Sequence, residues 1–287
     1  MIFVFYDSLT MSLNKPIFKL RDWIDIEKLN FTILSSNPSA IELLKTKPKE
    51  VVWYQLSSNP NAIELLKMNP RKINWHRLST NPNAIELLKA NPDKIDWYYL
   101  SENPAAMELL KANPDKIDWD SLSNNTNPEA IELLRSNIYF ANFYYLSKNP
   151  SAIELLKDNH YSIKWDQLSA NPAAIELLKA NPDKINWVYL SSNSAAFELL
   201  MANPTKIYWG AFSENPAAIE ILRENQDMIN WSYLSANPAI FTLDYEAMKR
   251  NNQELYEDLI KEVMKPSRVF RYPDYDYIEE LFGDDLY

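Results

Sequence analysis

A unit of 22 residues recurs along most of this chain, and it constrains the fold more than any other feature. Each copy begins with a Leu-Ser or Phe-Ser pair, whose first residues are Leu34, Leu56, Leu78, Leu100, Leu122, Leu146, Leu168, Leu190, Phe212 and Leu234. Every step is 22 residues except one of 24, between the fifth and sixth copies, where the polar stretch 124–128 holds the extra residues. The tenth copy decays after Pro238, and a partial copy with Leu29 and Phe31 precedes the first. Such self-similarity predicts a repeat architecture.

Each unit reads L-S-x-N-P-x-A-I-E-L-L-K-x-N-P-x-K-I-x-W-x-x, which predicts two short helices joined by a bend. Asn37 followed by Pro38 is typical of a helix start, because the Asn side chain accepts from first-turn N–H groups and Pro has no N–H to leave unpaired. The second Asn-Pro pair, as at Asn91, ends that helix. An Asn or Asp before the aromatic residue, such as Asp96, predicts the cap of a second, shorter helix.

Helices this short are not stable alone in water, so the units must stack. We therefore predict an all-α solenoid of about ten 22-residue helix–turn–helix repeats with terminal caps. A leucine-rich repeat is the main alternative, and its strand has the pattern L-x-L-x-x-N. Here Ile63 and Leu65 match the two apolar positions, but Asn69 comes one place too late. With neighbouring helices about 8–10 Å apart, stacked repeats would form a rod or arc on the order of 100 Å long.

The pattern changes at both ends of the repeats, which predicts four segments. Apolar residues near the start, Ile17, Phe18, Leu20, Trp23 and Ile24, are packing candidates for an N-terminal cap, and residues 246–264 read as one longer helix. The expected segments are an N-terminal cap (1–28), the repeat solenoid (29–243), a C-terminal capping helix (244–266) and an acidic aromatic tail (267–287).

Composition and charge exclude several classes of protein. The chain has no Cys and 2 Gly, which argues against a disulfide scaffold, a thiolate metal site, a phosphate-binding loop and a dinucleotide fingerprint. Residues 244–287 hold 12 acidic and 6 basic residues, whereas residues 1–243 hold 27 and 23, so the body lacks the basic excess that nucleic-acid binding needs. The chain has no apolar run long enough for a membrane helix, and its first residues lack the basic charge of a signal peptide. These features predict an intracellular protein that is not secreted.

The consensus also resembles a known group of proteins. The unit L-S-x-N-P-x-A-I-x-L-L-x-x-N-P-x-K-I-x-W is similar to short repeats of large double-stranded DNA viruses, over about residues 34–243. Chains of that group often end in P-S-R and an acidic tail, and Lys265-Pro266-Ser267-Arg268 before the acidic residues looks similar. The resemblance implies an all-helical viral repeat protein in the host cytoplasm or the virion, and it carries over no catalytic residue.

Catalytic signals are weak. His76 and His160 occupy different positions of their units and form neither a metal-binding pair nor a base beside a nucleophile, so we expect surface residues and no cofactor. A Glu occurs once per unit and is followed three residues later by Lys or Arg in all but one case, which predicts a neutral solvated face. The glutamates are Glu42, Glu64, Glu86, Glu108, Glu132, Glu154, Glu176, Glu198 and Glu220.

Two further rows have competing interpretations. The aromatic row could stack on bases or partner side chains, but its fixed spacing to the apolar residue three places on favours packing in the seam between units. It comprises Phe31, Trp53, Trp75, Trp97, Trp119, Phe143, Trp165, Trp187, Trp209 and Trp231. The Asn row could bind an extended peptide, as in armadillo-type solenoids, but the Pro that follows nearly every member favours helix capping. It comprises Asn37, Asn59, Asn81, Asn103, Asn127, Asn149, Asn171, Asn193, Asn215 and Asn237.

The two positions after the aromatic residue vary most between units and are rich in tyrosine, which suits a protein-binding surface, although drift would also produce variation. The candidates are Tyr54, His76, Arg77, Tyr98, Tyr99, Asp120, Tyr144, Tyr145, Asp166, Gln167, Tyr189 and Tyr233. These rows hold one Arg and no Lys against two Asp, which disfavours nucleic acid. We therefore expect a non-enzymatic protein–protein interaction scaffold with an elongated surface. The alternative is a structural component of a virus particle or other assembly.

Overall fold

The computed structural model describes residues 16–263 and confirms an all-α repeat solenoid. The chain divides into two units, residues 20–242 and the segments 1–19 with 243–287. The first unit holds all the repeats, and the described part of the second contains the longer helix α21 (Tyr245–Val263). Each unit is described by itself below, and predictions for residues 1–15 and 264–287, including the acidic tail, lie outside the described residues.

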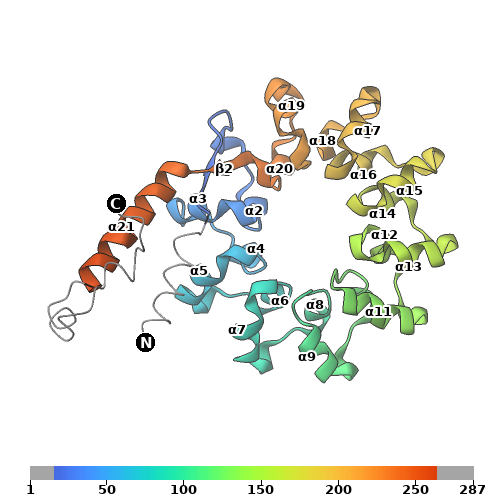
Figure 1. The fold of residues 1–287 in the computed structure, drawn as a ribbon, viewed down its shortest axis with the longest axis horizontal. Helices are drawn as coiled ribbons and strands as arrows, with labels where there is room; N and C mark the ends of the chain where they lie inside the picture. Colours follow the sequence, from blue (N-terminus) through green and yellow to red (C-terminus); the bar gives the residue numbers. More distant parts are fainter. Residues whose placement is uncertain (1–15, 264–287) are drawn as a thin grey trace, which may run out of the picture. The chain divides into compact units, whose positions relative to one another are not determined.

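One helix of each repeat begins at the aromatic residue, as the Asn/Asp capping pattern predicts. In α8 the Asp96 side chain accepts from the backbone N–H groups of Tyr98 and Tyr99, at 3.1 and 3.4 Å. These helices lie on the inner side of the repeat array (Figure 1) and consecutive ones pack together. They are α2 (Phe31–Leu34), α4 (Trp53–Leu56), α6 (Trp75–Ser79), α8 (Trp97–Ser101), α10 (Trp119–Leu122), α12 (Phe143–Lys148), α14 (Trp165–Ser169), α16 (Trp187–Ser192), α18 (Trp209–Phe212) and α20 (Trp231–Leu234).

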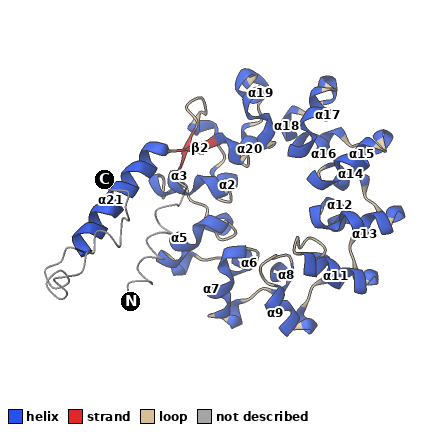
Figure 2. Cartoon of the chain, in the orientation of Figure 1, coloured by secondary structure: helices blue, strands red, loops and turns tan. Residues whose placement is uncertain are grey.

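The other helix of each repeat lies on the outer side (Figure 2) and usually starts with a short 3-10 turn at Pro-x-Ala. The second Asn ends it, since the Asn91 side chain donates to the carbonyl of Leu87 at 2.9 Å. The outer helices are α3 (Ile41–Thr46), α5 (Ile63–Met68), α7 (Ile85–Lys89), α9 (Met107–Ala112), α11 (Pro128–Ser136), α13 (Ile153–Asp158), α15 (Ile175–Lys179), α17 (Phe197–Met201) and α19 (Ile219–Glu224). The 3-10 turns before them are η2 (Pro38–Ala40), η3 (Pro60–Ala62), η5 (Pro82–Ala84), η9 (Pro150–Ala152), η11 (Pro172–Ala174), η13 (Ser194–Ala196) and η15 (Pro216–Ala218), and the equivalent turn η17 (Pro238–Ile240) precedes strand β2 (Phe241–Leu243) instead.

A second set of 3-10 turns precedes every inner helix except α4, and all of these turns but η1 follow an outer helix. Those turns are η1 (Ile26–Lys28), η4 (Pro70–Lys72), η6 (Pro92–Lys94), η7 (Pro114–Lys116), η8 (Ile138–Phe140), η10 (His160–Ser162), η12 (Pro182–Lys184), η14 (Pro204–Lys206) and η16 (Gln226–Met228). The core is made from the same few positions of each unit. In the second repeat Leu56, Ala62 and Leu66 are all fully buried, and the equivalent residues of the other repeats match them.

Neighbouring repeats are joined by a recurring set of hydrogen bonds from the Asn and Ser rows. Asn103 is fully buried, and its Nδ2 donates to the carbonyls of Ser79 and Asn81 in the preceding repeat, at 2.9 and 3.0 Å. Its Oδ1 accepts from the N–H of Ala105, so one side chain caps a helix and also fastens a seam. The hydroxyl of Ser79 accepts from the Asp96 N–H at 3.1 Å. These bonds confirm helix capping for the Asn row. They also show that the amides bond to the preceding repeat, where they are buried and cannot bind a peptide.

The 24-residue step shifts this pattern by two residues. Asn125, not Asn127, is fully buried and donates to the carbonyls of Ser101 and Asn103. Asn127 keeps the helix-capping role, because its Oδ1 accepts from the N–H of Glu129 at 2.9 Å. The prediction of a capping role for Asn127 is therefore confirmed, but the buried contact with the preceding repeat is made by Asn125. The two inserted residues separate these two roles at this one repeat.

The repeats of residues 20–242 close into a ring (Figure 1), and the expectation of an open rod or arc is wrong. Asn37 of the first repeat donates to the carbonyls of Ser235 and Asn237 of the last repeat, both at 3.2 Å. The N–H of Asn30 donates to the Ser235 hydroxyl at 2.8 Å. These are the contacts that every interior seam makes, so within this unit the last repeat meets the first as any other neighbour does. A full turn divided over ten seams requires about 36° per step.

The tenth repeat is assembled from both ends of the unit. Its first half is residues 234–242, and residues 20–33 supply the half that the decayed copy lacks. The ammonium of Lys28 lies over the ring of Trp231, 4.9 Å from its centroid. Lys206, at the same position of an interior repeat, lies over Trp187 of the repeat before it in the same way. The partial copy before the first repeat is thus the missing end of the last one. The structure places residues 20–28 in the ring, where no open front face is left for them to cap.

Two short strands stand where the outer helix of the tenth repeat would be. Strand β1 (Phe18–Leu20) pairs with β2 (Phe241–Leu243) in a two-stranded sheet. Beside them the Arg21 N–H donates to the carbonyl of Ile240 at 2.9 Å, and its Nε donates to that of Ala239 at 2.8 Å. Of the helices within residues 16–263, none has both the length and the apolar character needed to cross a membrane.

Candidate protein-binding surface on the inner helices

The inner helices present the two varied positions that follow each aromatic residue. The aromatic residue and the Leu three places later share one helix face and turn toward the seams, so the two residues between them point away. Five tyrosines at these positions are exposed, with fractional exposures of 39–49%. They are Tyr54, Tyr98, Tyr144, Tyr189 and Tyr233. Exposed tyrosine therefore recurs around the inner helices of the ring.

The aromatic row lies at the seams, as expected, but it is only half-buried. A lysine from the next linking turn covers several of the rings. The ammonium of Lys94 is 4.7 Å from the centroid of the Trp75 ring, and that of Lys116 is 4.6 Å from Trp97. Such cation–π contacts explain how a large ring can remain partly outside the core without forming an exposed apolar patch.

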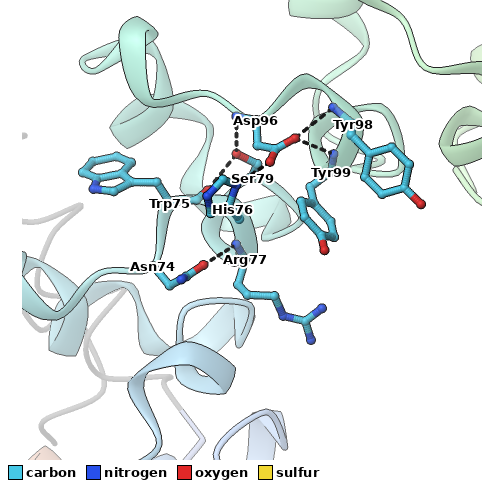
Figure 3. A network of polar contacts seen from close by, with 8 residues as sticks. All are labelled: Asn74, Trp75, His76, Arg77, Ser79, Asp96, Tyr98 and Tyr99. Atoms are coloured by element: carbon cyan, nitrogen blue, oxygen red, sulfur yellow. Dashed lines mark hydrogen bonds and ion pairs between the residues drawn. The ribbon is translucent and has the colours of Figure 1, made fainter.

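Side chains at the first varied position pair with the helix cap of the next repeat. His76 Nδ1 contacts the Asp96 carboxylate (Figure 3). Asp120 accepts from the Asn142 amide at 2.8 Å, and Asp166 accepts from the Asn186 amide at 2.8 Å in the same way. The residue at the first varied position is therefore complementary to the cap of the next repeat. Histidine faces a cap that is an aspartate, and aspartate faces a cap that is an asparagine.

The second varied position is less exposed than the first in most repeats, Tyr189 and Tyr233 excepted, and at Arg77 it ties two inner helices together. Arg77 donates to the Gln55 amide oxygen at 3.0 Å and lies over the Tyr54 ring, with 5.3 Å from its guanidinium carbon to the ring centroid. Tyr99 packs edge-on against Tyr98, at 5.1 Å between centroids. Gln167 is 6% exposed, so this candidate lies under the surface and its side chain is not offered to a partner.

The structure brings two tyrosine pairs toward each other across one repeat. Tyr144 and Tyr145 meet edge-on, 5.5 Å between centroids, as Tyr98 and Tyr99 do. The proximity of Tyr98 raises the pKa of Tyr145, with smaller contributions from burial and from Asp120. Asp120 lies on α10, between the helices that carry the two pairs: α10 packs against α8, and Asp120 accepts from Asn142 at the start of α12.

The outer helices carry the neutral face that the Glu row predicts. Lys89 pairs with Glu86 at 3.0 Å, and most other repeats form the same pair three residues apart, with both side chains solvent-exposed. His160 is exposed and packs against Tyr161. Within residues 16–263 no three His, Asp or Glu side chains are grouped to hold a metal ion. An open hollow of about 440 Å³ at one seam is lined by residues including Trp75, His76 and Asp96, and among these it offers no nucleophile beside the imidazole.

Two prominent features were not found from the sequence. The Ser of every Leu-Ser pair fastens a seam, and its regular recurrence was the available signal. In addition, Tyr139 and Tyr161 are 99% and 94% exposed on the linking turns η8 and η10. The signal there was replacement of Pro-Asp-Lys by Ile-Tyr-Phe and His-Tyr-Ser in two successive units. These tyrosines lie outside the inner helices and serve below as controls.

Comparisons with protein-family models, with curated proteins and with solved structures find no match to this chain.

Proposed function

We propose that this protein is a non-enzymatic scaffold that binds another protein through the inner helices of its ring. The observation that carries the proposal is the recurrence of exposed tyrosine at the two varied positions of an otherwise uniform repeat. Tyr98 and Tyr144 are 49% and 48% exposed, whereas the Leu and Ala positions beneath them are fully buried in every repeat. Tyrosine supplies a large contact area with little side-chain entropy to lose, and it is enriched in protein interfaces.

The ring itself supports this role. The inner helices are held by seam and core contacts, and most of them also by a side-chain cap. The cap contacts of α8 and α12 use the backbone N–H groups of Tyr98 and Tyr144, so both rings stay free while the backbone beneath them is fixed. A rigid surface loses less entropy on binding than a mobile one. The varied side chains can then differ from repeat to repeat without disturbing the fold.

The test compares matched tyrosine pairs in a capture experiment. Full-length protein, the Tyr98→Ala/Tyr144→Ala variant and the Tyr139→Ala/Tyr161→Ala control are used as bait in cell lysate, and captured proteins are quantified by mass spectrometry. Both variants lose two exposed tyrosines, but only the first loses them from inner helices. We expect a protein that is captured by the wild type and the control and is lost with the first variant.

Two results would contradict the proposal. Equal capture by all three baits would place the binding surface elsewhere. Recovery of virus-particle proteins or of the chain itself, unaffected by either substitution, would instead favour a structural component of a particle or assembly.

A further inference from the structure

Three successive inner helices, α8, α10 and α12, carry a distinctive combination of side chains. The outer two present the pairs Tyr98–Tyr99 and Tyr144–Tyr145, and the middle one presents Asp120. Asp120 is exposed, and the next residue of the middle helix is a small, buried serine. A carboxylate is thus set between two pairs of aromatic rings, in the region of the 24-residue step.

Two carboxylates beside these rings, Asp120 and Glu102, carry negative charge that no ion pair offsets within residues 16–263. Asp120 lies beside the start of α12, because the Asn142 side chain that donates to it also accepts from the Tyr144 N–H at 3.0 Å, and Glu102 directly follows α8. Their recorded partners are amides: Asn142 donates to Asp120 at 2.8 Å, and Asn124 donates to Glu102 at 3.3 Å.

The patch already attracts one ammonium group from its own chain. Lys148 lies over the Tyr145 ring, 5.4 Å from its centroid. Tyr98 and Tyr144 have no cation over their rings among the described residues, and both are about half exposed. Their π faces have the negative electrostatic character that cations favour, and a nearby carboxylate adds to it.

We infer that this tyrosine–aspartate patch, defined as Tyr98, Tyr99, Asp120, Tyr144 and Tyr145, receives a lysine or arginine side chain of a basic protein segment. The inference rests on the proposed function and specifies the chemistry of the partner. The carboxylate of Asp120 supplies charge complementarity, and the exposed tyrosine rings supply cation–π contacts. An apolar or acidic segment would leave the Asp120 charge unpaired at the interface, which is unfavourable.

The test measures binding of a defined probe to the full chain. A fluorescent peptide of six Gly-Arg repeats is titrated with protein, and anisotropy gives Kd. The matched probe replaces each arginine by citrulline, which keeps the shape of the side chain but removes its charge. The acidic C-terminal residues give both wild type and variants the same background attraction for a basic peptide.

Three variants separate the contributions. Asp120→Asn removes the carboxylate, and Tyr98→Leu/Tyr144→Leu removes the π faces while keeping apolar bulk. Asp166→Asn is the control, because Asp166 is also exposed and makes the same amide contact, yet only one neighbouring repeat carries a tyrosine pair. We expect the first two variants to weaken binding of the arginine peptide about three- to tenfold each and the control to change it less than twofold.

The inference fails if the citrulline peptide binds as tightly as the arginine peptide, if neither peptide binds, or if Asp120→Asn and Asp166→Asn weaken binding equally. These outcomes differ from failure of the proposed function. A protein captured through Tyr98 and Tyr144 that is insensitive to Asp120→Asn would leave the scaffold function intact and refute the cationic partner.

Discussion

Replacing Asn37 by alanine tests whether the ring is closed. Asn37 is 2% exposed, and its Nδ2 donates to the carbonyls of Ser235 and Asn237, both at 3.2 Å. Its Oδ1 accepts from the N–H of Ser39 at 3.0 Å and so caps the first outer helix. The substitution therefore removes one helix cap and two contacts across the closing seam.

The magnitude follows from what each removed contact leaves behind. Loss of an Asn cap lowers the free energy of unfolding by about 1 kcal/mol. The Asn237 carbonyl still accepts from the Ile240 N–H at 3.4 Å, whereas the Ser235 carbonyl has no other recorded partner in the ring. A buried acceptor left unpaired costs about 1–3 kcal/mol. We therefore expect Asn37→Ala to lower the free energy of unfolding by about 3 kcal/mol in total.

Two comparison variants make the measurement decisive. Asn103→Ala removes the same three contacts at an interior seam, where the repeats are covalently continuous. Asn83→Ala removes a cross-repeat contact of the same kind, to the Pro60 carbonyl at 2.9 Å, but from an exposed side chain. We expect Asn103→Ala to match Asn37→Ala, and Asn83→Ala to cost less than about 0.5 kcal/mol.

Urea unfolding followed by tryptophan fluorescence gives the three values. In an open array the Asn37 amide would have no last repeat to contact, and its substitution would remove only the cap. A loss of about 1 kcal/mol for Asn37→Ala beside about 3 kcal/mol for Asn103→Ala would refute ring closure.

Three further predictions concern single contacts. Lys94→Met keeps the aliphatic stem but removes the ammonium over Trp75, so the free energy of unfolding in urea should fall by about 0.5–1 kcal/mol; no change would exclude a cation–π contribution. A Cβ at Gly210 would lie 2.9 Å from the Tyr208 ring. Gly210→Ala should therefore give its helix-propensity gain of about 1 kcal/mol in unfolding free energy only when Tyr208 is also replaced by alanine, and a double-mutant cycle measures this coupling. Partial desolvation raises the pKa of Glu214 although the residue remains solvent-exposed, so the folded state binds its proton more tightly. Stability is therefore lost as pH rises from the ordinary carboxyl pKa through the raised one. Glu214→Gln should raise Tm slightly at pH 7 and leave it unchanged below about pH 4, and an equal gain at both pH values would contradict the assignment.

The local structure of each repeat could be predicted from particular residues. Asn before Pro caps the outer helix, Asp96 caps an inner helix, and Asn91 ends an outer one, because capping depends on side chains a few residues from the backbone groups they satisfy. The neutral Glu–Lys face is local in the same sense.

The candidate surface could be predicted only in part. Variation in the sequence located the exposed row of Tyr98 and Tyr144, but it also selected Gln167, which is buried. Exposure depends on how far neighbouring inner helices approach each other, and that distance is set by packing across seams. The contact between Asp120 and the next cap was equally inaccessible, because it joins residues in different repeats.

Residue type and short spacing were enough to predict the repeat, its two helices, their ends and the absence of cysteine chemistry. That the repeats form a ring, and that residues 20–33 complete the tenth repeat, is evident only in the folded chain. Curvature accumulates from a small rotation at every seam, and the packing of buried Leu, Ala and Asn side chains against the next repeat fixes that rotation. Only when that rotation is repeated around a full turn does Asn37 meet Ser235, which lies 198 residues away in the chain.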